Sequence, residues 1–595
     1  MKRILLLIIA LAAAAFAGWY YWKVSLQISS APVSAFLPRK TIFLAHLPDF
    51  NRIRDDWHRC DIYQLYREPA VQDFLHPAIV GLTNLPTLKA FGARTLQEIE
   101  QLDPKQAFLA LTSMENNNPK FIAGFHFGGS QESAERIING WGSTFLEQTP
   151  GAKREKLQYQ HHEIELVTTA PFTLATTYDG PWFFAATDVM ELKALLDRAD
   201  HRAKNPEDTL DKDAAYRTAL HHQPSTYAAF FYLQPKIFSD RLAALRAAVR
   251  SSPASDESTM LEKMRCIAGS TRFEHGKIHD VLFLGMPKLE HETALTRSSL
   301  SLGTKESFFY LSMLLNLGER IDTLNQVTAL AGAKIFRALA DSGISADDWK
   351  AAFGLELSSL ADWPSSAHWP SLILTLPIMD KAKAEKIVEA FIGADTKAAW
   401  TQTEKDGVRY FSKQSTASLV AITLTIAVSE RILLAGFNPV SVEEAMKRSG
   451  VGSSELSDSQ TYRAAAGLLP APTNFFAYVD TGLLYSRLDA SLRPILLMAA
   501  AFVPAIASSV DPAKLPSPEV ITRHLSPIVA SQRYDRDGYV AESIGPVALD
   551  QSAIGLAILS SLGAGARQKA GAAMTRWGAS STATPEPTAS PSPTP

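Results

Sequence analysis

Hydrophobic and polar positions recur along this chain at a spacing the size of a domain. The stretch LDKDAAYRTALHHQPSTYAAFFYL (Leu210–Leu233) is matched by LSDSQTYRAAAGLLPAPTNFFAYV (Leu456–Val479), and Tyr216 and Tyr462 lie 246 positions apart (462 − 216). Self-similarity at one fixed offset indicates internal repetition. A period of this length predicts two copies of a whole module and not a solenoid of short repeats.

Amphipathic helices are predicted at the same place in both copies. In the first copy, apolar residues follow the spacing of one helix face, namely Ala134, Ile137, Ile138, Trp141 and Phe145. The second copy has its stripe 250 positions later (384 − 134), with Ala384, Ile387, Val388 and Phe391. Asp380 is the predicted N-cap of that helix. Arg198 and Arg448 also differ by 250, inside helices that are predicted to begin at Asp188 and at Asn438 or Ser441. Further helical stretches are Asn51–Leu75, Lys236–Arg250, Glu319–Leu339 and Gly482–Ala501.

Alternating apolar residues between turn signals predict strands that pair through hairpins. The modules open with strands in Leu37–Phe50 and Leu302–Leu315, where Phe308 is matched with Phe43 at an offset of 265 (308 − 43). Later strands are Lys120–Phe127, Phe172–Thr177 with Trp182–Ala186, and Leu419–Val428 with Ile432–Gly436. Each copy ends in a hairpin, Ile267–Leu284 and Ile528–Gly545, with tight turns predicted at His275-Gly276 and Asp537-Gly538. Hairpin pairing makes antiparallel sheets.

The predicted fold class is therefore α+β, with two homologous modules of antiparallel sheet and packed helices, preceded by one N-terminal transmembrane helix. The segments are a signal anchor or signal peptide (1–23), a connector (24–36), the first module (37–290), the second module (302–550), a C-terminal helical segment (551–578) and a disordered Pro/Ser/Thr-rich tail (579–595).

The N-terminal segment predicts export of the body. Ile4 to Trp22 is uncharged over 19 residues (22 − 4 + 1), close to the roughly 20 needed to cross a bilayer, and it ends in an aromatic cluster. Lys2 and Arg3 favour a cytoplasmic N-terminus, so the expected location is the inner membrane as a single-pass protein with its body outside the cytoplasm. The alternative is a secreted or periplasmic product cleaved between Ala17 and Gly18.

Two other apolar runs are shorter. Ile495 to Val510 contains Pro504, and Ala553 to Ala566 contains three glycines. Runs of this length are more typical of buried or amphipathic helices than of membrane spans. The pattern leaves open whether Ile495 to Val510 touches lipid.

Charge and cysteine content narrow the function classes. The formal net charge of −3 comes from nearly equal numbers of basic and acidic residues, which excludes the basic field of a nucleic-acid-binding protein. Cys60 and Cys266 are too few for a disulfide scaffold. They could form one bridge in an oxidising compartment or stay as two buried thiols.

Sequence motifs of catalysis are missing from the chain, which has no Walker loop, G-x-S-x-G elbow, H-E-x-x-H helix, C-x-x-C pair or dinucleotide fingerprint. Gly128-Gly129-Ser130 precedes a helix and could bind an anion, but a turn and helix cap is the expected role. The second copy has Ile378-Met379-Asp380 at that place.

Histidine clusters offer the other candidate chemistry. His161-His162-Glu163, and His275 with His279-Asp280, could supply zinc ligands. Neighbours in a strand point to opposite faces, so His161 and His162 would need a bend to share a site. Solvated hairpin residues are the expected interpretation, because Arg536 and Ala541 stand in the second copy for His275 and His279. Loop exposure is expected for His221-His222.

The repeated pairs Tyr216-Arg217 and Tyr462-Arg463 could contact a ligand from a helix. Packing of the tyrosine on the sheet, with the arginine in solvent or capping the helix, is the expected arrangement. We therefore assign no catalytic, cofactor-binding or metal-binding residue, and we expect no cofactor.

A family resemblance rests on the N-terminal anchor, the LPxxT-type opening strand, the pair FGARTLQEIEQL (Phe91–Leu102) and FGLELSSLADW (Phe353–Trp363), and the Tyr-Arg helix before P-x-x-x-x-FFxY. Over roughly residues 37–550, the chain resembles bacterial membrane-anchored, exported proteins known only as a domain of unknown function. The resemblance implies a duplicated α+β module and carries over no catalytic residues.

The expected function is a non-enzymatic, membrane-tethered binding or scaffolding protein of the bacterial envelope. Its expected partners are the membrane, through Ile4 to Trp22, and an envelope protein; nucleic acid is not expected. The alternatives are a carrier or sensor of an apolar ligand held between sheet and helices near Ile495 to Val510, and an exported hydrolase. Oligomeric state is not predicted.

Overall fold

The structure is a computed structural model, and it describes residues 32–83, 93–114, 118–147, 151–169, 172–236, 263–288, 294–314, 342–394, 399–414, 422–450, 453–502 and 514–547. Several predicted segments lie outside these residues. They are the membrane segment Ile4 to Trp22, the helix Glu319–Leu339, nearly all of the helix Lys236–Arg250, the run Ala553 to Ala566, the helical segment 551–578 and the tail 579–595.

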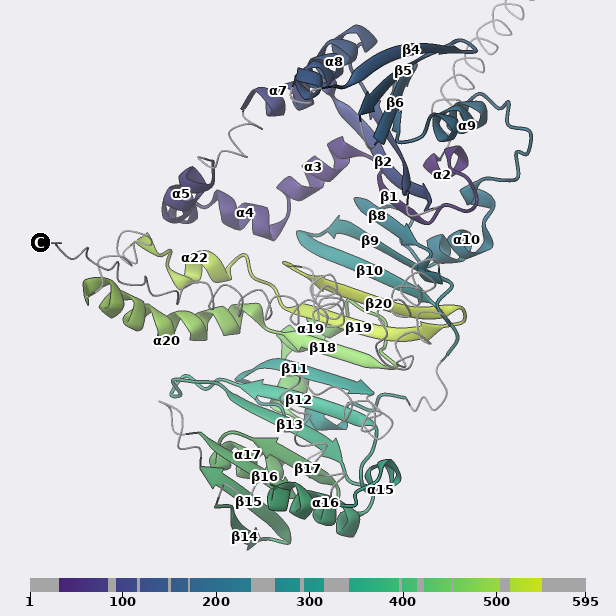
Figure 1. Ribbon diagram of the computed structural model, residues 1–595. Coiled ribbons are helices and arrows are strands. Elements are labelled where there is room, and N and C mark those ends of the chain that lie inside the picture. The colour runs from purple at the N-terminus through teal and green to yellow at the C-terminus, as the bar shows by residue number, and fades with distance from the viewer. Residues whose placement is uncertain are drawn as a thin grey trace, which may run out of the picture.

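One antiparallel sheet of 20 strands runs through the described chain (Figure 1). From one edge to the middle, the first half contributes β4 (Lys153–Tyr159), β5 (His162–Thr169), β6 (Phe172–Asp179), β7 (Trp182–Ala186), β3 (Lys120–Phe127), β2 (Pro104–Ser113), β1 (Phe43–Leu47), β8 (Ala229–Leu233), β9 (Cys266–Glu274) and β10 (Lys277–Gly285).

The second half continues the same sheet from β10 to the other edge. Its strands are β20 (Gly538–Gly545), β19 (Ile528–Asp535), β18 (Phe475–Val479), β11 (Ser307–Leu314), β12 (Glu356–Asp362), β13 (Ser371–Pro377), β17 (Ile432–Gly436), β16 (Thr423–Val428), β15 (Val408–Gln414) and β14 (Thr401–Lys405).

The strand order of the two halves is mirrored about the β10–β20 junction. Outward from that junction, each strand of the second half carries a label ten higher than the strand at the same distance in the first half. At the junction itself, Val281 pairs with Glu542, and these residues are 261 positions apart (542 − 281). The repeated serines Ser270 and Ser531 differ by the same 261 and pair with Val281 and Glu542 within their own hairpins. A pseudo-twofold axis therefore passes between Val281 and Glu542.

Helices connect the strands and cover the sheet. In the first half they are α2 (Val33–Phe36), α3 (Phe50–His58), α4 (Asp61–Arg67), α5 (Pro69–Thr83), α7 (Ala93–Leu102), α8 (Gln131–Glu147), α9 (Val189–Ala199) and α10 (Ala214–His221). The second half has α15 (Ala346–Ala352), α16 (Lys381–Ala394), α17 (Pro439–Arg448), α18 (Glu455–Asp458), α19 (Gln460–Ala466), α20 (Thr481–Phe502) and α22 (Pro518–Thr522). In Figure 1, α2, α9 and α10 lie on one side of the upper strands, whereas α3, α4, α5, α20 and α22 lie on the other.

Short polar side chains fix where the repeated helices begin. Asp188 accepts hydrogen bonds from two backbone N–H groups at the start of α9, and Asn438, 250 positions later, accepts one from Val440 at the start of α17. Asp213 and Ser459 cap α10 and α19 in the same way, 246 positions apart. Both predicted offsets thus recur in the caps, and the prediction of an N-cap at Asp380 is confirmed by its bond from the Lys383 N–H.

The main hydrophobic cores follow the predicted stripes. In the first half, Leu192, Leu195 and Leu196 of α9 pack with residues of β1, β2, β3 and β8. In the second half, Val442, Ala445 and Met446 of α17 pack with the matching strands. The stripes of α8 and α16 are buried at Ala134, Ile137, Ala384, Ile387 and Val388. The predicted α+β class with antiparallel pairing is confirmed, although the two halves share one sheet instead of forming two.

Several details of the fold differ from the sequence prediction. Leu44 pairs with Tyr232, and Tyr310 pairs with Tyr478, so the opening strands match at an offset of 266 (310 − 44) and not 265. A β-bulge between Ser307 and Phe309 provides the extra residue. The short helix α2 also occupies the end of the predicted connector 24–36, where Val33 and Phe36 are buried.

The last hairpin turns one residue earlier than predicted. Its loop is Arg536-Asp537, because Asp535 already pairs with Gly538. The glycine is needed for close packing and not for the turn, since a Cβ at Gly538 would collide with the backbone carbonyl oxygen of Leu284 across the junction. The register also makes Val540, and not Ala541, the counterpart of His279 (540 − 279 = 261).

Candidate functional site

The repeated tyrosines are core residues, as predicted. Tyr216 and Tyr462 are both buried, and each meets the tyrosine of the following strand edge to face, with ring centroids 5.1 Å apart for Tyr232 and 5.0 Å apart for Tyr478. Arg217 is exposed, and the guanidinium of its counterpart in the second half donates to the Asp458 carbonyl beside the helix. Both tyrosines therefore pack in the core, and Arg463 binds the backbone beside its own helix.

The repeated arginines Arg198 and Arg448 each bind the chain just before the first strand of their own half. Arg198 Nε donates to the Phe36 carbonyl at 2.6 Å, and Arg448 Nε donates to the Leu302 carbonyl at 2.8 Å. Burial lowers the pKa of Arg198. The repeat identifies the two arginines from the sequence. Their carbonyl acceptors could not be predicted, because they lie 162 and 146 positions away.

The glycine-rich turn before α8 caps the helix, as predicted. Ser130 Oγ accepts from the Ser133 N–H at 3.3 Å, and the Gly128 N–H donates to the Asp103 carbonyl at 2.9 Å. Asp103 also forms an ion pair with Lys105 beside the turn. The negative charge of Asp103 beside Gly128 makes this turn unfavourable for binding an anion.

His161 and His162 meet at one carboxylate, contrary to the expectation from strand alternation. His162 Nε2 lies 3.0 Å and His161 Nε2 lies 3.7 Å from Asp200 Oδ2 at the end of α9. The bend arises because Gln160 adopts a positive φ of 56° and β5 begins only at His162. No spacing pattern in the sequence indicates Asp200 as their partner, because it lies 38 positions from His162. Glu163 points elsewhere and pairs with Lys156.

The other histidine cluster splits into a solvated and a buried part. His275 is exposed at the hairpin tip, as predicted, but His279 and Asp280 are buried, so the solvated interpretation is wrong for them. Arg272 Nη2 donates to His279 Nδ1 at 2.8 Å, and His279 Nε2 lies 3.2 Å from Glu542 Oε2 across the junction. They are buried because β10 is a central strand of the joined sheet and not an edge.

Glu542 completes a polar network on the pseudo-twofold axis. Its other oxygen accepts from Arg533, the counterpart of Arg272 (533 − 272 = 261). Burial raises the pKa of the Glu542 carboxyl group, but hydrogen bonds from His279 and Arg533 outweigh it and leave that pKa below its ordinary value. The network connects the two halves of the chain.

His222 is also buried, although loop exposure was expected. Its ring stacks on Phe283 with centroids 4.3 Å apart, and its nitrogens lie 3.7 Å from Asp535 and 3.8 Å from Asp537 of the other half. Burial lowers the pKa of this imidazole. His222 therefore belongs to the same junction.

Both cysteines are buried free thiols, so the alternative of a bridge between Cys60 and Cys266 is wrong for this structure. Burial raises the pKa of each thiol to about 11, with a smaller contribution from the neighbouring Asp61 at Cys60. Thiols of this kind are poor nucleophiles near neutral pH.

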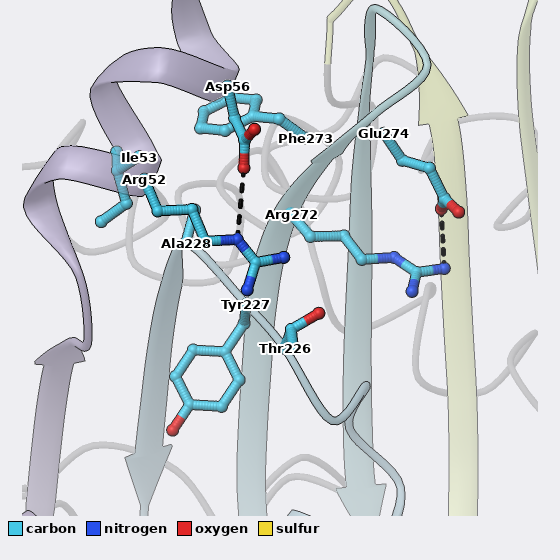
Figure 2. Close-up of a pocket in the computed structure, with 9 residues that line it drawn as sticks. All are labelled: Arg52, Ile53, Asp56, Thr226, Tyr227, Ala228, Arg272, Phe273 and Glu274. Atoms are coloured by element: carbon cyan, nitrogen blue, oxygen red, sulfur yellow. Dashed lines mark hydrogen bonds and ion pairs between the residues drawn. The ribbon is translucent and has the colours of Figure 1, made fainter.

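A small cavity lies between α3 and the ends of β8 and β9 (Figure 2). Its volume is about 140 Å³, and it is lined by Arg52, Ile53, Asp56, Thr226, Tyr227, Ala228, Arg272, Phe273 and Glu274. Figure 2 shows that both arginines are paired, Arg52 with Asp56 and Arg272 with Glu274. The cavity is small for a drug-sized ligand, and its cations already have counter-charges.

A second hollow, of about 310 Å³, lies between α2 and the chain after α9. Its lining includes charged side chains such as Arg198, Glu207 and Lys212. Cavities that hold drug-sized ligands are about 300–1,000 Å³ and mostly apolar. The first hollow is smaller than this, and the second lies at the low end of the range with charged side chains in its wall.

The distal part of α20 exposes apolar side chains. Ile495, Leu496, Leu497 and Met498 are between 40% and 58% exposed. The sequence predicts a buried or amphipathic helix here, and the buried alternative is wrong for these four residues. At about 100° per residue, four consecutive positions face most of the circumference of the helix. The apolar run is visible in the sequence, but the sequence does not show whether other parts of the chain bury these side chains.

Polar contacts hold the proximal part of α20 and its neighbour α22. Arg487 Nε donates to the Trp363 carbonyl at 2.9 Å, and Arg493 binds Asp489 and the carbonyls that precede α22. From the other half, Glu68 pairs with Arg523 and His524 at the end of α22. Polar contacts therefore fix the first part of α20, whereas the side chains of Ile495 to Met498 are exposed. None of the helices among the described residues is long and apolar enough to span a bilayer.

Fold and sites together define a class: a pseudosymmetric α+β protein with one continuous antiparallel sheet and a projecting apolar helix. No protein-family model matches the chain, and the search of curated proteins gives no match. Among solved structures, crystal form I of TP0453 matches at 6% identity with a TM-score of 0.23, covering 44% of this chain and 81% of that one. Crystal form III gives the same score, with 43% of this chain covered. Similarity at this TM-score does not establish a shared fold.

Proposed function

We propose that this chain is a non-enzymatic, membrane-tethered binding or scaffolding protein of the bacterial cell envelope. The apolar run Ile4 to Trp22 would anchor it, with the body outside the cytoplasm. Its two halves would be copies of one ancestral module. The distal end of α20, Ile495 to Met498, would be the binding element, and an envelope protein would be its partner.

The exposed apolar end of α20 is the observation that carries this proposal. A helix that is hydrophobic on all sides belongs in an environment that surrounds it. Fully burying one such side chain is worth about 2 kcal/mol, so covering four half-exposed ones would contribute on the order of 4 kcal/mol to a complex. The polar contacts of Arg487 and Arg493 also support a role in binding, because they hold α20 in place and a rigid element loses little entropy on binding.

The carrier alternative receives less support. It calls for an apolar cavity of several hundred Å³, whereas the first hollow is about 140 Å³ and the second, of about 310 Å³, has Arg198, Glu207 and Lys212 in its lining. A hydrolase with a cysteine nucleophile receives less support, because burial raises the pKa of both thiols.

Site-specific photo-crosslinking in intact cells tests the proposal. A photoreactive amino acid at Leu497 is expected to give one discrete crosslinked protein band in the membrane fraction, and the product should disappear when Ile495 and Met498 are changed to Asp. The same label at Met379, which is exposed on the turn before α16, is the matched control and should not give this band. A crosslink to lipid alone, equal products at both positions, or a cytosolic protein would contradict the proposal.

A further inference from the structure

We propose that His161, His162 and Asp200 form a binding site for a divalent transition-metal ion of the zinc class, on the edge hairpin of the first half. Imidazole nitrogens and a carboxylate oxygen are the ligands that zinc takes in proteins, with one position left for water or a further ligand. This site is independent of the apolar end of α20.

The ligand atoms already lie at the spacing that a metal ion requires. The three candidate ligand atoms are all within 4.8 Å of one another. Ligands at about 2 Å from a tetrahedral zinc ion are about 3.3 Å apart. The observed distances to Asp200 Oδ2, 3.0 Å from His162 Nε2 and 3.7 Å from His161 Nε2, lie on either side of that value.

The burial of the ligands also suits a site with one open side. His162 is almost completely buried, and Asp200 keeps 16% of its side-chain surface, whereas His161 is 63% exposed. An ion could therefore approach from the side of His161 and be held by two groups whose positions are fixed by packing. Asp179 at the end of β6 lies close enough to interact electrostatically with all three residues, and burial raises the pKa of its carboxyl group.

The second half of the chain provides an internal comparison. Its equivalent hairpin pairs Lys405 with Val408, where the first half pairs Tyr159 with His162, so His161 and His162 correspond to Gly407 and Val408 (407 − 161 = 246). The offset of 250 between α9 and α17 places Gly450 at the position of Asp200. The same fold forms there without any of the three side chains, so packing alone does not require them. Their convergence in the first half points to a separate role.

Arg202 is a competitor inside the site. Its Nη1 lies 2.6 Å from the same Asp200 oxygen that both histidines approach. A metal ion would have to displace this guanidinium or take the other carboxylate oxygen. The guanidinium has a second partner within reach, because Arg202 Nη2 lies 3.4 Å from Asp197 Oδ1. Removal of the Arg202 charge should therefore strengthen metal binding, whereas a purely structural ion pair predicts no metal binding at all.

Titration of the full-length protein in detergent tests the site. After treatment with a chelator, Zn²⁺ is added in a calorimeter and Co²⁺ is added while visible absorption is recorded. We expect one ion per chain and a Co²⁺ spectrum of a four-coordinate site. His161→Ala should weaken binding at least tenfold, and because this side chain is mostly exposed, its loss should not disturb folding. Arg202→Gln should tighten binding.

His201→Asn is the matched control, since His201 is an exposed neighbour that lies outside the cluster. Its positive φ of 55° suits asparagine, and this variant should bind as the wild type does. A wild-type protein that binds neither ion would overturn the proposal. Binding that His161→Ala leaves unchanged would overturn it as well, because the ion would then sit elsewhere.

Discussion

Replacement of Glu542 by Ala should weaken the junction between the two halves. In the native protein one carboxylate oxygen accepts from Arg533, and the other lies 3.2 Å from His279 Nε2. Because Arg272 donates to Nδ1 of His279, that nitrogen is an acceptor and Nε2 carries the proton for Glu542. The substitution would leave this buried N–H and a partly buried guanidinium without their acceptor.

The expected cost follows from the burial of each partner. Leaving a buried donor unpaired costs about 1–3 kcal/mol, and His279 is almost fully buried. The bond to Arg533 contributes less, because 27% of that side chain is exposed and water can replace the carboxylate. We expect Glu542→Ala to lower the free energy of unfolding by about 3 kcal/mol in total, near the low end for breaking a buried ion pair.

Urea unfolding followed by circular dichroism measures this loss. Glu274→Gln is the matched control, because Glu274 binds the equivalent arginine of the first half but is 40% exposed; its cost should stay below about 0.5 kcal/mol. The difference should also depend on pH. The pKa of Glu542 in the folded protein is lower than its ordinary 4.5, so its contribution is present above pH 4.5 and is lost as pH falls through the lowered pKa. Equal costs for the two variants, or a difference that grows in acid, would refute the reasoning.

Three further predictions concern the repeat, the junction and the thiols. Arg198→Ala and Arg448→Ala should each lower the free energy of unfolding by about 2 kcal/mol, since each removes a charged donor from a backbone carbonyl; a large effect from one alone, in parallel urea melts, would contradict their equivalence. Gly538→Ala should lower the melting temperature by several degrees, because the added methyl group collides with the β10 backbone; calorimetry that gives the wild-type value would argue against the pairing. Cys60 and Cys266 should resist a thiol reagent at pH 7 until urea unfolds the chain, and fast labelling of the native protein would disprove their burial.

Elements with a strong local pattern could be predicted from the sequence. The strand Lys120–Phe127 has the predicted bounds, and the stripes of α8 and α16 are buried at Ala134, Ile137, Ala384, Ile387 and Val388, although Trp141 of the predicted stripe is exposed. Caps such as Asp188 and Asp380 were also visible, because their partners lie within three residues. These features depend on neighbours in the chain.

Features that depend on distant partners could not be predicted. Alternation in β10 and β20 identifies strands but does not say that these two lie side by side, 261 positions apart. The burial of His279 follows only from that pairing. His161 and His162 converge because Gln160 adopts a positive φ, and a glutamine in the sequence does not predict that conformation. The apolar run at Ile495 looked like core because exposure is a property of the assembled fold.

Crosslinking across the pseudo-twofold axis tests the central claim most directly. Leu282→Cys and Ala541→Cys, which replace directly opposite residues of β10 and β20 outside the polar network, are introduced together, with Cys60 and Cys266 changed to Ala. Residues directly opposite in antiparallel strands have Cβ atoms about 5 Å apart, so a short thiol crosslinker should join the two positions within one chain almost completely. Moving one cysteine to Met379, far from the junction in the strand order, should abolish the product. If Leu282→Cys and Ala541→Cys remain unlinked in the folded protein, the two halves do not meet edge to edge, and the continuous sheet is wrong.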